Sequence, residues 1–533
     1  MASSSPISLG PVDQFPLGSL RMARAGTLKL VVVRTSEGFT VLDNACPHEG
    51  YGLVQGEVTD GALVCAWHNW RFRLSDGRCL RGEEDVTLHP AQVVDGKLMV
   101  SLLDPPAGER RARLLASLRR GLDDGYVGQI SRDVVRLLRA DADPVQLVWE
   151  AVAWGAPRAE FGFGHAMASL VDCLAMADHF EGDARALPVV AAFAGVAETE
   201  RRRPLRPQPH PATSLPKDPG ASFGEALEGG DLDRAEGLVR AIIVTGDVAA
   251  ARRWLIRAVG DHQLSYGHGA IYVHKAFELL DRLGDDRAGS VLPHLVPALG
   301  WATRQDKLPY MRPFMKALAS VDLAALADAE PIAGWDGDRL VIDALLGPDP
   351  ATAVRAATSA VAGGGGVTGL LDAVTRTGAH RLLHYDPAAE VTTDRHDFGW
   401  LDLTHVITYA AAARWAWHAD PGPHTARLAL FTAFLAQYAG RKGYVEIAGE
   451  GPPAERPDDT ELFGTALGDG AGSFIMAAHQ VKTSWAAWNE AAVLGSDEPV
   501  AAVHRMMSAP RRERFVALNV RKAVHLADGR IPG

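Results

Sequence analysis

The sequence predicts a multidomain protein, in which a small antiparallel all-β module is followed by a large all-α domain of stacked helices. Two observations lead to this fold class. Short strand-like runs separated by glycine-containing turns occupy the N-terminal part, whereas apolar residues recur at helical spacing from about Glu109 onward. The first pattern is typical of strands and the second of amphipathic helices. The length of 533 residues also exceeds what a single core usually holds.

The β module is predicted from strand-like runs between Leu20 and Leu103. These runs are LKLVVVRT, FTVLDN, ALVCAW, WRFRL and KLMVSLL. Asp-Gly pairs at Asp60–Gly61 and Asp95–Gly96 lie between runs, and this pair favours hairpin turns. We therefore expect the module to cover residues 1–104 and to end at the stiff stretch Asp104–Gly108.

The helical domain is predicted over residues 109–533. Apolar stripes recur in segments such as RLLASLRRGL and IYVHKAFELLDRL, and several of these segments carry a histidine near their start. Such a series of related segments is compatible with stacked helix pairs. Three stretches rich in proline or glycine interrupt the pattern and are predicted to be long loops. They are the Pro/Arg-rich stretch Glu198–Ser222, the Gly363–Gly366 run and Gly449–Asp459.

Composition excludes several classes of protein. The net charge is −11 and no basic face carries interleaved aromatic residues, so nucleic acid is not expected as a partner. The N-terminus MASSSPISLG does not resemble a signal peptide, and no apolar stretch is long enough to span a membrane. The four cysteines give no disulfide framework. We expect a cytoplasmic protein.

One motif in the β module carries chemistry. Cys46-Pro47-His48 is followed, after sixteen residues, by Cys65-Ala66-Trp67-His68. Two thiolates and two neutral imidazoles on neighbouring loops suit a [2Fe–2S] cluster, in which the thiolates hold one iron and the imidazoles the other. The same residues could bind zinc, but their spacing and β context favour the cluster. The motif closely resembles that of the Rieske family, which implies transfer of single electrons.

Residues near the motif indicate the subtype. Rieske subunits of respiratory complexes carry an extra disulfide at the positions that Tyr51 and Trp67 occupy here, and a serine at the position of Trp70. The segment CAWHNWRFRLSDGRCL instead resembles the ferredoxins of ring-hydroxylating oxygenases and the small nitrite-reductase subunits. Asn69 replaces the glycine usual there, a change we expect to be tolerated. Fewer hydrogen-bond donors to the cluster imply a low reduction potential and a role in electron delivery.

The sequence does not predict the mononuclear iron site that accepts electrons in ordinary Rieske oxygenases. Their mononuclear iron is held by an Asp-x-x-His-x-x-x-x-His pattern, which is absent from this sequence. His268 and His274 come nearest, but they are six residues apart where five are needed and lie in a helical context.

The helical domain offers instead several histidines on apolar helices. His165, His268, His405 and His479 lie among Ala, Met, Ile and similar residues. A buried imidazole is costly unless it is bonded, so each could be satisfied by a backbone carbonyl or all could share a metal. Other histidines of the helical domain that could replace one of these as a metal ligand are His274, His380 and His384.

Fragments of this domain show a second, fainter resemblance. HGAIYVHKAFEL, LTHVITYAAA and HQVK are similar to the histidine-bearing helices of the questin-oxidase-like family of non-haem iron oxygenases. The resemblance implies a mononuclear Fe(II) held by His165, His268, His405 and His479 together with a carbamylated lysine, for which Lys482 is the candidate. His479 and Lys482 would share a helix face, and an anionic ligand would offset the charge of buried iron. The alternative is that Lys482 is a surface lysine.

Together these features predict a Rieske-coupled oxygenase. The cluster would deliver electrons to a mononuclear iron that activates O2 for oxygenation or C–C cleavage of a small hydrophobic substrate, aromatic or polyketide-like. Tyr266, Tyr272 and Tyr409 lie beside candidate ligands and could act in catalysis or simply pack. An external flavin or ferredoxin reductase is expected, because no dinucleotide-binding loop is found. The alternatives are an electron-transfer adaptor with a helical scaffold, and a zinc or dinuclear hydrolase with a redox-sensing cluster.

Overall fold

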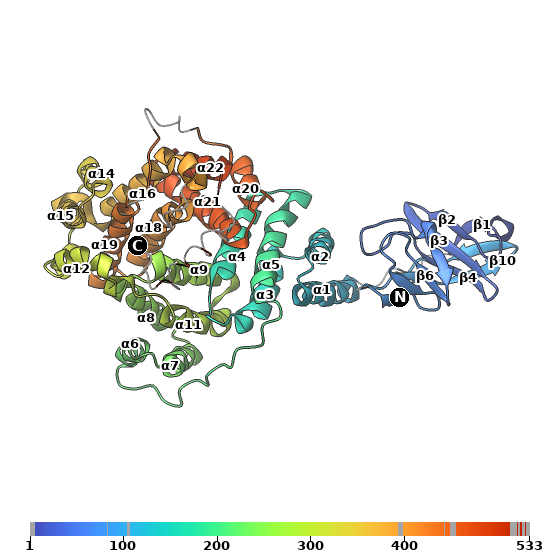
Figure 1. Cartoon of the computed structure of the whole chain (residues 1–533). Coiled ribbons are helices and arrows are strands. Elements are labelled where there is room, and N and C mark those ends of the chain that lie inside the picture. The colour runs from blue at the N-terminus through green and yellow to red at the C-terminus, as the bar shows by residue number, and fades with distance from the viewer. Residues whose placement is uncertain are drawn as a thin grey trace. The chain divides into compact units, whose positions relative to one another are not determined.

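The computed structural model describes residues 6–82, 84–103, 107–392, 398–441, 443–447 and 455–511, with isolated positions beyond (Figure 1). The chain divides into two compact units, residues 1–121 with 126–141, and residues 122–125 with 142–533. Antiparallel β-sheets come first and a large helical domain follows, which confirms the predicted fold class. The predicted boundary at residues 104–106 and most of the predicted loop Gly449–Asp459 lie outside the described residues.

Short antiparallel sheets make up the β part of the first unit. Their strand orders are β1–β11–β10, β2–β3–β4–β9 and β5–β6–β7–β8. The strands are β1 (Ile7–Pro11), β2 (Leu20–Ala25), β3 (Leu28–Thr35), β4 (Gly38–Asp43), β5 (Glu57–Thr59), β6 (Ala62–Val64), β7 (Arg71–Arg73), β8 (Cys79–Arg81), β9 (Leu88–His89), β10 (Ala91–Val94) and β11 (Lys97–Val100).

Strand β3 connects two hydrophobic cores. Successive side chains of a strand point to opposite faces. Val31 therefore packs into the core that contains Cys46 and Cys65. Its neighbour Val32 packs into a second core with Leu98. The run of β-branched residues in β3 thus fills both faces, and one of them supports the loops that carry the Cys-x-His and Cys-x-x-His motifs.

Two helices belong to the first unit. Helix α1 (Ala107–Asp124) begins where the sequence pattern becomes helical, and helix α2 (Val127–Arg139) follows. The buried Gln129 amide of α2 donates a hydrogen bond to the Ser117 carbonyl of α1 at 2.8 Å. This contact ties the two helices together.

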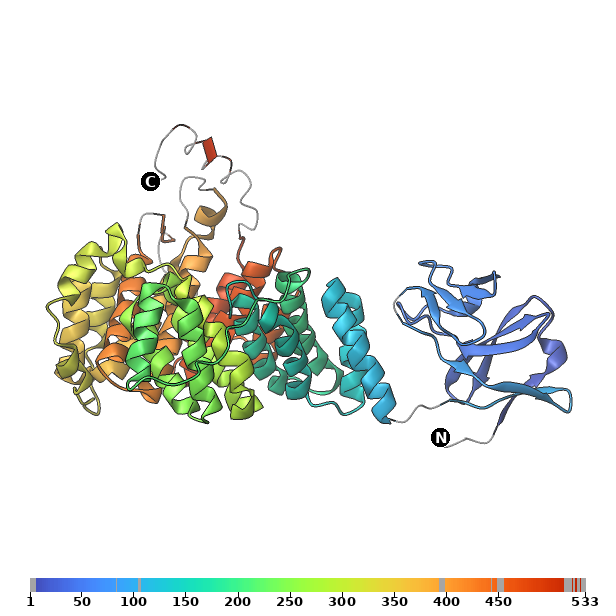
Figure 2. The same ribbon diagram turned by 90° about the horizontal axis from the view of Figure 1, so that it is seen from below.

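The second unit is helical, and Figure 2 shows its helices standing side by side. The helices are α3 (Pro144–Gly155), α4 (His165–Met176), α5 (Ala186–Glu200), α6 (Pro219–Gly229), α7 (Leu232–Val244), α8 (Val248–Asp261), α9 (His268–Leu283), α10 (Ala288–Val291), α11 (Leu295–Gly300), α12 (Arg312–Leu318), α13 (Leu323–Ala327), α14 (Asp338–Leu346), α15 (Pro350–Ala360), α16 (Gly366–His384), α17 (Pro387–Thr392), α18 (Trp400–Ala419), α19 (Pro423–Tyr438), α20 (Asp459–Leu467), α21 (Phe474–Leu494) and α22 (Glu498–Ser508). Among the described residues, none of the helices is sufficiently long and apolar to cross a membrane.

Local sequence explains where several helices begin. Helices α3, α6 and α15 each start with an Asp-Pro pair, at Asp143, Asp218 and Asp349. In each case the carboxylate accepts a hydrogen bond from a backbone N–H of the first turn. Proline at the first helical position has no N–H to leave unpaired.

The prediction of a long loop at Gly363–Gly366 is wrong. Residues Val361–Gly365 form a π-helical turn that leads directly into α16. Gly364 (φ +104°) and Gly366 (φ +59°) adopt left-handed backbone conformations that a side chain would disfavour. The glycines therefore bend a continuous helical segment instead of breaking it. The predicted Glu198–Ser222 loop falls largely between the end of α5 and the start of α6.

Four helices of the second unit close a ring. Helix α4 packs against α9, α9 against α18, α18 against α21, and α21 against α4. These are the helices that carry His165, His268, His405 and His479. The tertiary packing therefore brings together segments that lie far apart in the sequence.

Candidate metal centres

The first candidate centre lies on two loops of the β module. Cys46 and His48 follow β4, and Cys65 and His68 follow β6. The Nδ1 atoms of His48 and His68 are 3.0 Å apart, so both imidazoles point to one place. Both cysteines are buried, with 2% and 1% of their surface exposed. The two thiols are thus buried, and the two imidazoles face each other.

The loop backbones hold these donors in place. The Cys46 N–H donates to the Tyr51 carbonyl at 2.8 Å, and the Cys65 N–H donates to the Trp70 carbonyl at 2.8 Å. Asn69 has a φ of +58°. Asparagine tolerates this left-handed conformation better than most residues, which explains how it can stand where glycine is usual.

Aromatic residues join the two loops. The Tyr51 and Trp67 rings stack with their centroids 4.1 Å apart and their planes at 14°. Trp70 stacks on the His48 ring at 4.9 Å. The positions of the disulfide and the serine in respiratory Rieske subunits are therefore occupied by aromatic rings that pack the loops together.

The electrostatics of this centre suit a cationic cluster. Burial raises the pKa of Cys46 to about 12, so its thiolate needs a metal to be stable. Burial also lowers the pKa of His48 below its ordinary value, and the neighbouring His68 contributes to this shift. A neutral imidazole is the form that binds a metal. The donor set therefore fits a [2Fe–2S] cluster with two thiolate and two imidazole ligands.

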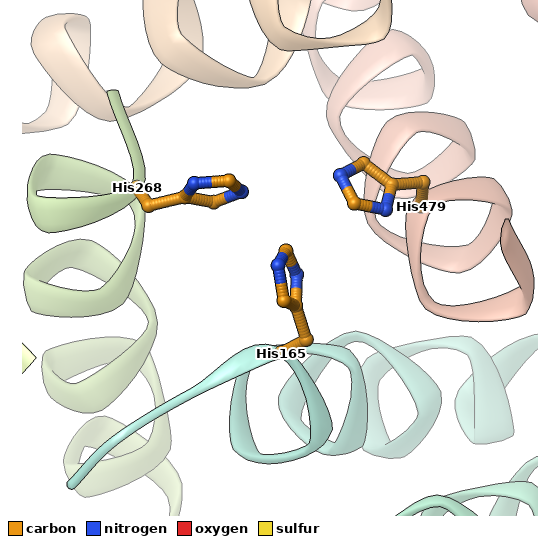
Figure 3. A group of neighbouring side chains, drawn as sticks. All are labelled: His165, His268 and His479. Atoms are coloured by element: carbon orange, nitrogen blue, oxygen red, sulfur yellow. The ribbon is translucent and has the colours of Figure 1, made fainter. Parts of the chain in front are cut away.

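The second candidate centre lies inside the ring of four helices. The His405 Nε2 atom is 3.0 Å from the His268 Nε2 atom and 3.2 Å from the His479 Nε2 atom. The ligand atoms of His165, His268 and His479 lie within 4.8 Å of one another, and Figure 3 shows these three rings turned toward each other from three helices. Lys482, one turn after His479, places its Nζ 2.7 Å from the His165 Nδ1.

Backbone hydrogen bonds fix which nitrogen faces the centre. The His479 Nδ1–H donates to the Ile475 carbonyl at 2.6 Å, one turn earlier in α21. The His405 Nδ1–H donates in the same way to the Leu401 carbonyl. With Nδ1 protonated, the Nε2 lone pair of each ring is free and directed inward.

His405 and His479 are buried, and His165 and His268 are partly buried. Burial lowers the pKa of His165, His268 and His479 well below the ordinary value, and that of His405 to about 3. With both Nδ1 atoms protonated, the Nε2 lone pairs of His405 and His479 face each other at 3.2 Å with no donor between them. A metal ion at the centre would satisfy these lone pairs.

Comparisons with known proteins identify the first part of the chain. The family profile of the Rieske [2Fe-2S] domain matches residues 5–91. These residues form a Rieske domain. The helical remainder of the chain is not assigned to a family by this comparison.

Relatives of the Rieske domain belong to several oxygenase systems. The chain is 29% identical over 92 residues to the ferredoxin component of an alkene monooxygenase system from Xanthobacter autotrophicus, covering 17% of this chain and 75% of that protein. It is 42% identical over 53 residues to the oxygenase subunit of 3-chlorobenzoate-3,4-dioxygenase from Comamonas testosteroni, but this covers only 10% of this chain and 12% of that subunit. The ferredoxin of carbazole 1,9a-dioxygenase from Nocardioides aromaticivorans is a similar solved structure, with 21% identity, coverage of 19% of this chain and 100% of that one, and a TM-score of 0.18.

The alternative histidines lie away from the four-histidine group. His274 stacks on Trp415 at 5.1 Å and lies 3.7 Å from the Glu278 carboxylate. His380 and His384 stack on each other at 3.9 Å in α16. Among the described residues, neither set belongs to a group of three or more donors placed for a metal.

Two of the three candidate tyrosines contact the four-histidine group. Tyr272 stacks on His268 at 5.5 Å, and its ring is 5.9 Å from the His165 ring. The Tyr266 ring is 6.0 Å from the His405 ring and is 37% exposed, whereas Tyr409 is buried. Burial raises the pKa of Tyr272 and of Tyr409, which keeps both hydroxyls protonated.

A strained turn positions His268 and was not predicted. Ser265, Tyr266 and Gly267 all have positive φ, directly before His268 begins α9. A Cβ atom on Gly267 would lie 2.4 Å from the Tyr409 ring, so this ring packs on the bare backbone. Strained non-glycine residues are stable only where the surroundings hold them, and such strain is common at functional sites. The Ser-Tyr-Gly sequence before an apolar helix was the available signal.

A buried ionic group beside Lys482 was also not predicted. Lys275 Nζ lies 2.6 Å from both the Asp172 and the Glu278 carboxylates. Burial alone would lower the pKa of Lys275, but the two carboxylates hold it above its ordinary value. Among the described residues no carboxylate forms an ion pair with Lys482, and burial lowers its pKa to about 7. The surroundings therefore shift the pKa values of the two buried lysines in opposite directions.

Proposed function

We propose that this protein is a Rieske-coupled non-haem iron oxygenase. The observation that carries the proposal is the convergence of His165, His268, His405 and His479 from four separate helices. Imidazole ligands with free inner nitrogens suit ferrous iron. The Rieske domain in the same chain would supply the electrons that such an iron needs.

In this proposal Cys46 and Cys65 hold one iron of the Rieske cluster, and His48 and His68 hold the other. Loop hydrogen bonds and the convergence of the two Nδ1 atoms support this ligand set. The aromatic packing around His48, in place of hydroxyl donors, favours a low reduction potential. Such a cluster would accept electrons from an external flavin or ferredoxin reductase.

Lys482 is proposed to complete the second site as a carbamate. Four neutral imidazoles would leave the charge of a ferrous ion uncompensated inside the protein, which is costly. Among the described residues the group of donors around His165 includes no carboxylate. With a pKa near 7, a large fraction of Lys482 is neutral amine at neutral pH. Neutral amine adds to carbon dioxide and releases a proton, and the product is an anionic carbamate beside His165.

The surroundings of the second site suggest the kind of substrate. Bound iron would supply the chemistry of dioxygen activation. Tyr266 is partly exposed beside His405, Tyr272 stacks on His268, and Tyr409 is buried against Gly267, the residue before His268. Tyrosine rings stack on flat apolar molecules and their hydroxyls donate or accept protons. We therefore propose a hydrophobic aromatic or polyketide-like substrate, which is oxygenated or cleaved at a C–C bond with these tyrosines orienting it.

Metal analysis of the purified, fully loaded chain tests this function. We expect about three irons per chain, two in the cluster and one mononuclear. An electron-transfer adaptor would hold about two irons, and a hydrolase with a redox-sensing cluster would hold about two irons together with zinc. Consumption of dioxygen with an electron donor present would support the oxygenase further. A chain with only the iron of the cluster would contradict the proposal.

Replacing Lys482 tests the carbamate. We expect K482M to weaken binding of the mononuclear iron at least about tenfold, because an anionic ligand is lost. In the unmodified chain, carbon-13 bicarbonate should give a carbamate resonance that K482M lacks. The exposed Lys307, which pairs with Glu228, provides the control, since K307M should keep both the iron and the resonance. A resonance that persists in K482M would show that the carbamate lies elsewhere.

A further inference from the structure

The two imidazoles of the Rieske centre have different surroundings at their outer edges. His48 is partly buried, whereas His68 is exposed together with its neighbours Trp67 and Asn69. The Nδ1 atoms of both rings point inward, so the Nε2 atoms point away from the cluster position. The His48 Nε2 lies 2.6 Å from the Tyr126 hydroxyl. The His68 Nε2 lies 4.0 Å from the Glu49 carboxylate.

Tyr126 does not belong to the β module. It is the residue directly before α2 and is 78 positions from His48 in the sequence. Its ring lies 6.0 Å from the His48 ring with the planes at 29°. A Cβ atom on Gly128 would lie 3.2 Å from the Tyr126 ring, so the glycine leaves space for the ring over the first turn of α2. Tyr126 is thus placed by its own helix, with its hydroxyl toward the imidazole.

A further contact holds α2 against the β module, because Arg136 donates to the Glu84 carboxylate at 2.7 Å. Within α2, the Arg132 guanidinium lies 5.7 Å from the centre of the Tyr126 ring. The Arg136 and Glu84 side chains are 39% and 23% exposed, so this ion pair is partly shielded from solvent. The contact between Tyr126 and His48 is therefore part of a wider contact within the first unit.

The chemistry of a ligated imidazole fixes the direction of this hydrogen bond. When Nδ1 binds iron, Nε2 carries the remaining proton and can only donate. The Tyr126 hydroxyl oxygen therefore accepts it. An acceptor at the outer nitrogen makes the imidazole a stronger electron donor to its metal, which favours the oxidised state.

We propose that Tyr126 is a positioning residue of the Rieske centre. It covers the outer edge of His48 and lowers the reduction potential of the cluster. His68 is then the ligand whose outer edge is open to an external electron donor. The proposal rests on the proposed ligand set of the cluster. It does not depend on the second metal site. The two imidazole ligands then have separate roles, one facing the chain's own helices and one facing a partner.

Redox titration of the full chain tests the effect on potential. We expect Y126F to raise the midpoint potential of the cluster, because His48 loses its acceptor while the ring remains. Y51F is the matched control, since the Tyr51 ring stacks on Trp67 and lies 6.2 Å from the His68 ring. Y51F should leave the potential unchanged. The same potential in Y126F and the unmodified chain, with the cluster present in both, would overturn the proposal.

Footprinting tests whether Tyr126 shields the outer edge of His48. Hydroxyl-radical footprinting of the cluster-loaded chain, mapped by mass spectrometry, reports exposure of the ring itself and should oxidise His68 in large excess over His48. In Y126A the ratio of the two should fall toward one. Equal modification in the unmodified chain would contradict the proposal. A chain that binds no [2Fe–2S] cluster would instead refute the ligand set, which distinguishes the two failures.

Discussion

Replacing both His405 and His479 by alanine should remove one iron from each chain and leave the Rieske cluster intact. The two Nε2 atoms are 3.2 Å apart and each ring is oriented by a carbonyl of its own helix. Loss of two of four imidazoles leaves too few ligands for a stable mononuclear site. Iron content should fall from about three to about two per chain, with the visible spectrum of the cluster retained. Oxygen consumption should be lost at the same time.

The matched control is substitution of the second histidine pair. His380 and His384 lie on α16, stack on each other and are outside the four-histidine group. The double variant H380A/H384A should keep all three irons. The same iron content in both double variants would show that the proposed site is wrong. Loss of the cluster spectrum in H405A/H479A would show that this variant has unfolded, so that its iron content says nothing about the ligands.

Replacing Glu490 by glutamine should destabilise the helical unit by about 3–5 kcal/mol. Glu490 on α21 accepts bidentate hydrogen bonds from Arg414 on α18, at 3.0 and 2.9 Å, and another from Thr375 on α16. The Arg414 and Glu490 side chains are 9% and 3% exposed. Removal of one partner leaves a buried charge that Asp372 alone must balance. The free energy of unfolding can be measured by urea denaturation followed by tryptophan fluorescence.

An exposed ion pair of the same domain provides the control. Arg339 and Asp343 lie one turn apart on α14 at 3.1 Å, with side chains 80% and 55% exposed. D343N should change the free energy of unfolding by no more than about 0.5 kcal/mol, because solvent screens such pairs. Since α18 and α21 also carry His405 and His479, E490Q should weaken binding of the mononuclear iron in parallel. Equal stability of E490Q and D343N would contradict this role for the buried pair.

Local patterns predicted the β module and its metal motif well. The two Cys/His pairs lie on loops of one small module, only sixteen residues apart, so spacing alone was informative. The division between strands and helices followed from side-chain periodicity, which the backbone geometry of each element imposes. The Gly363–Gly366 run misled the prediction, because glycine both ends helices and permits bends inside them.

The two histidines of α9 show how tertiary packing selects between candidate ligands that the sequence alone leaves open. His268 and His274 are six residues apart, which is about 240° around a helix, so one helix cannot direct both to the same place. Tyr272, four residues from His268, lies on the same face and stacks on it. The sequence offered both histidines as candidates. Only the packing of α9 between α4 and α18 directs His268 to the group and His274 to Trp415.

The sequence by itself determined the order of the two parts, the Rieske motif, the positions of most helices and a set of candidate histidines, because these features depend on residues close together in the chain. The tertiary structure decided which histidines meet, which lysine lies beside them, and that Tyr126 reaches His48. Those contacts join residues tens to hundreds of positions apart. They depend on which helix faces pack together, and local periodicity carries no information about the partner of a face.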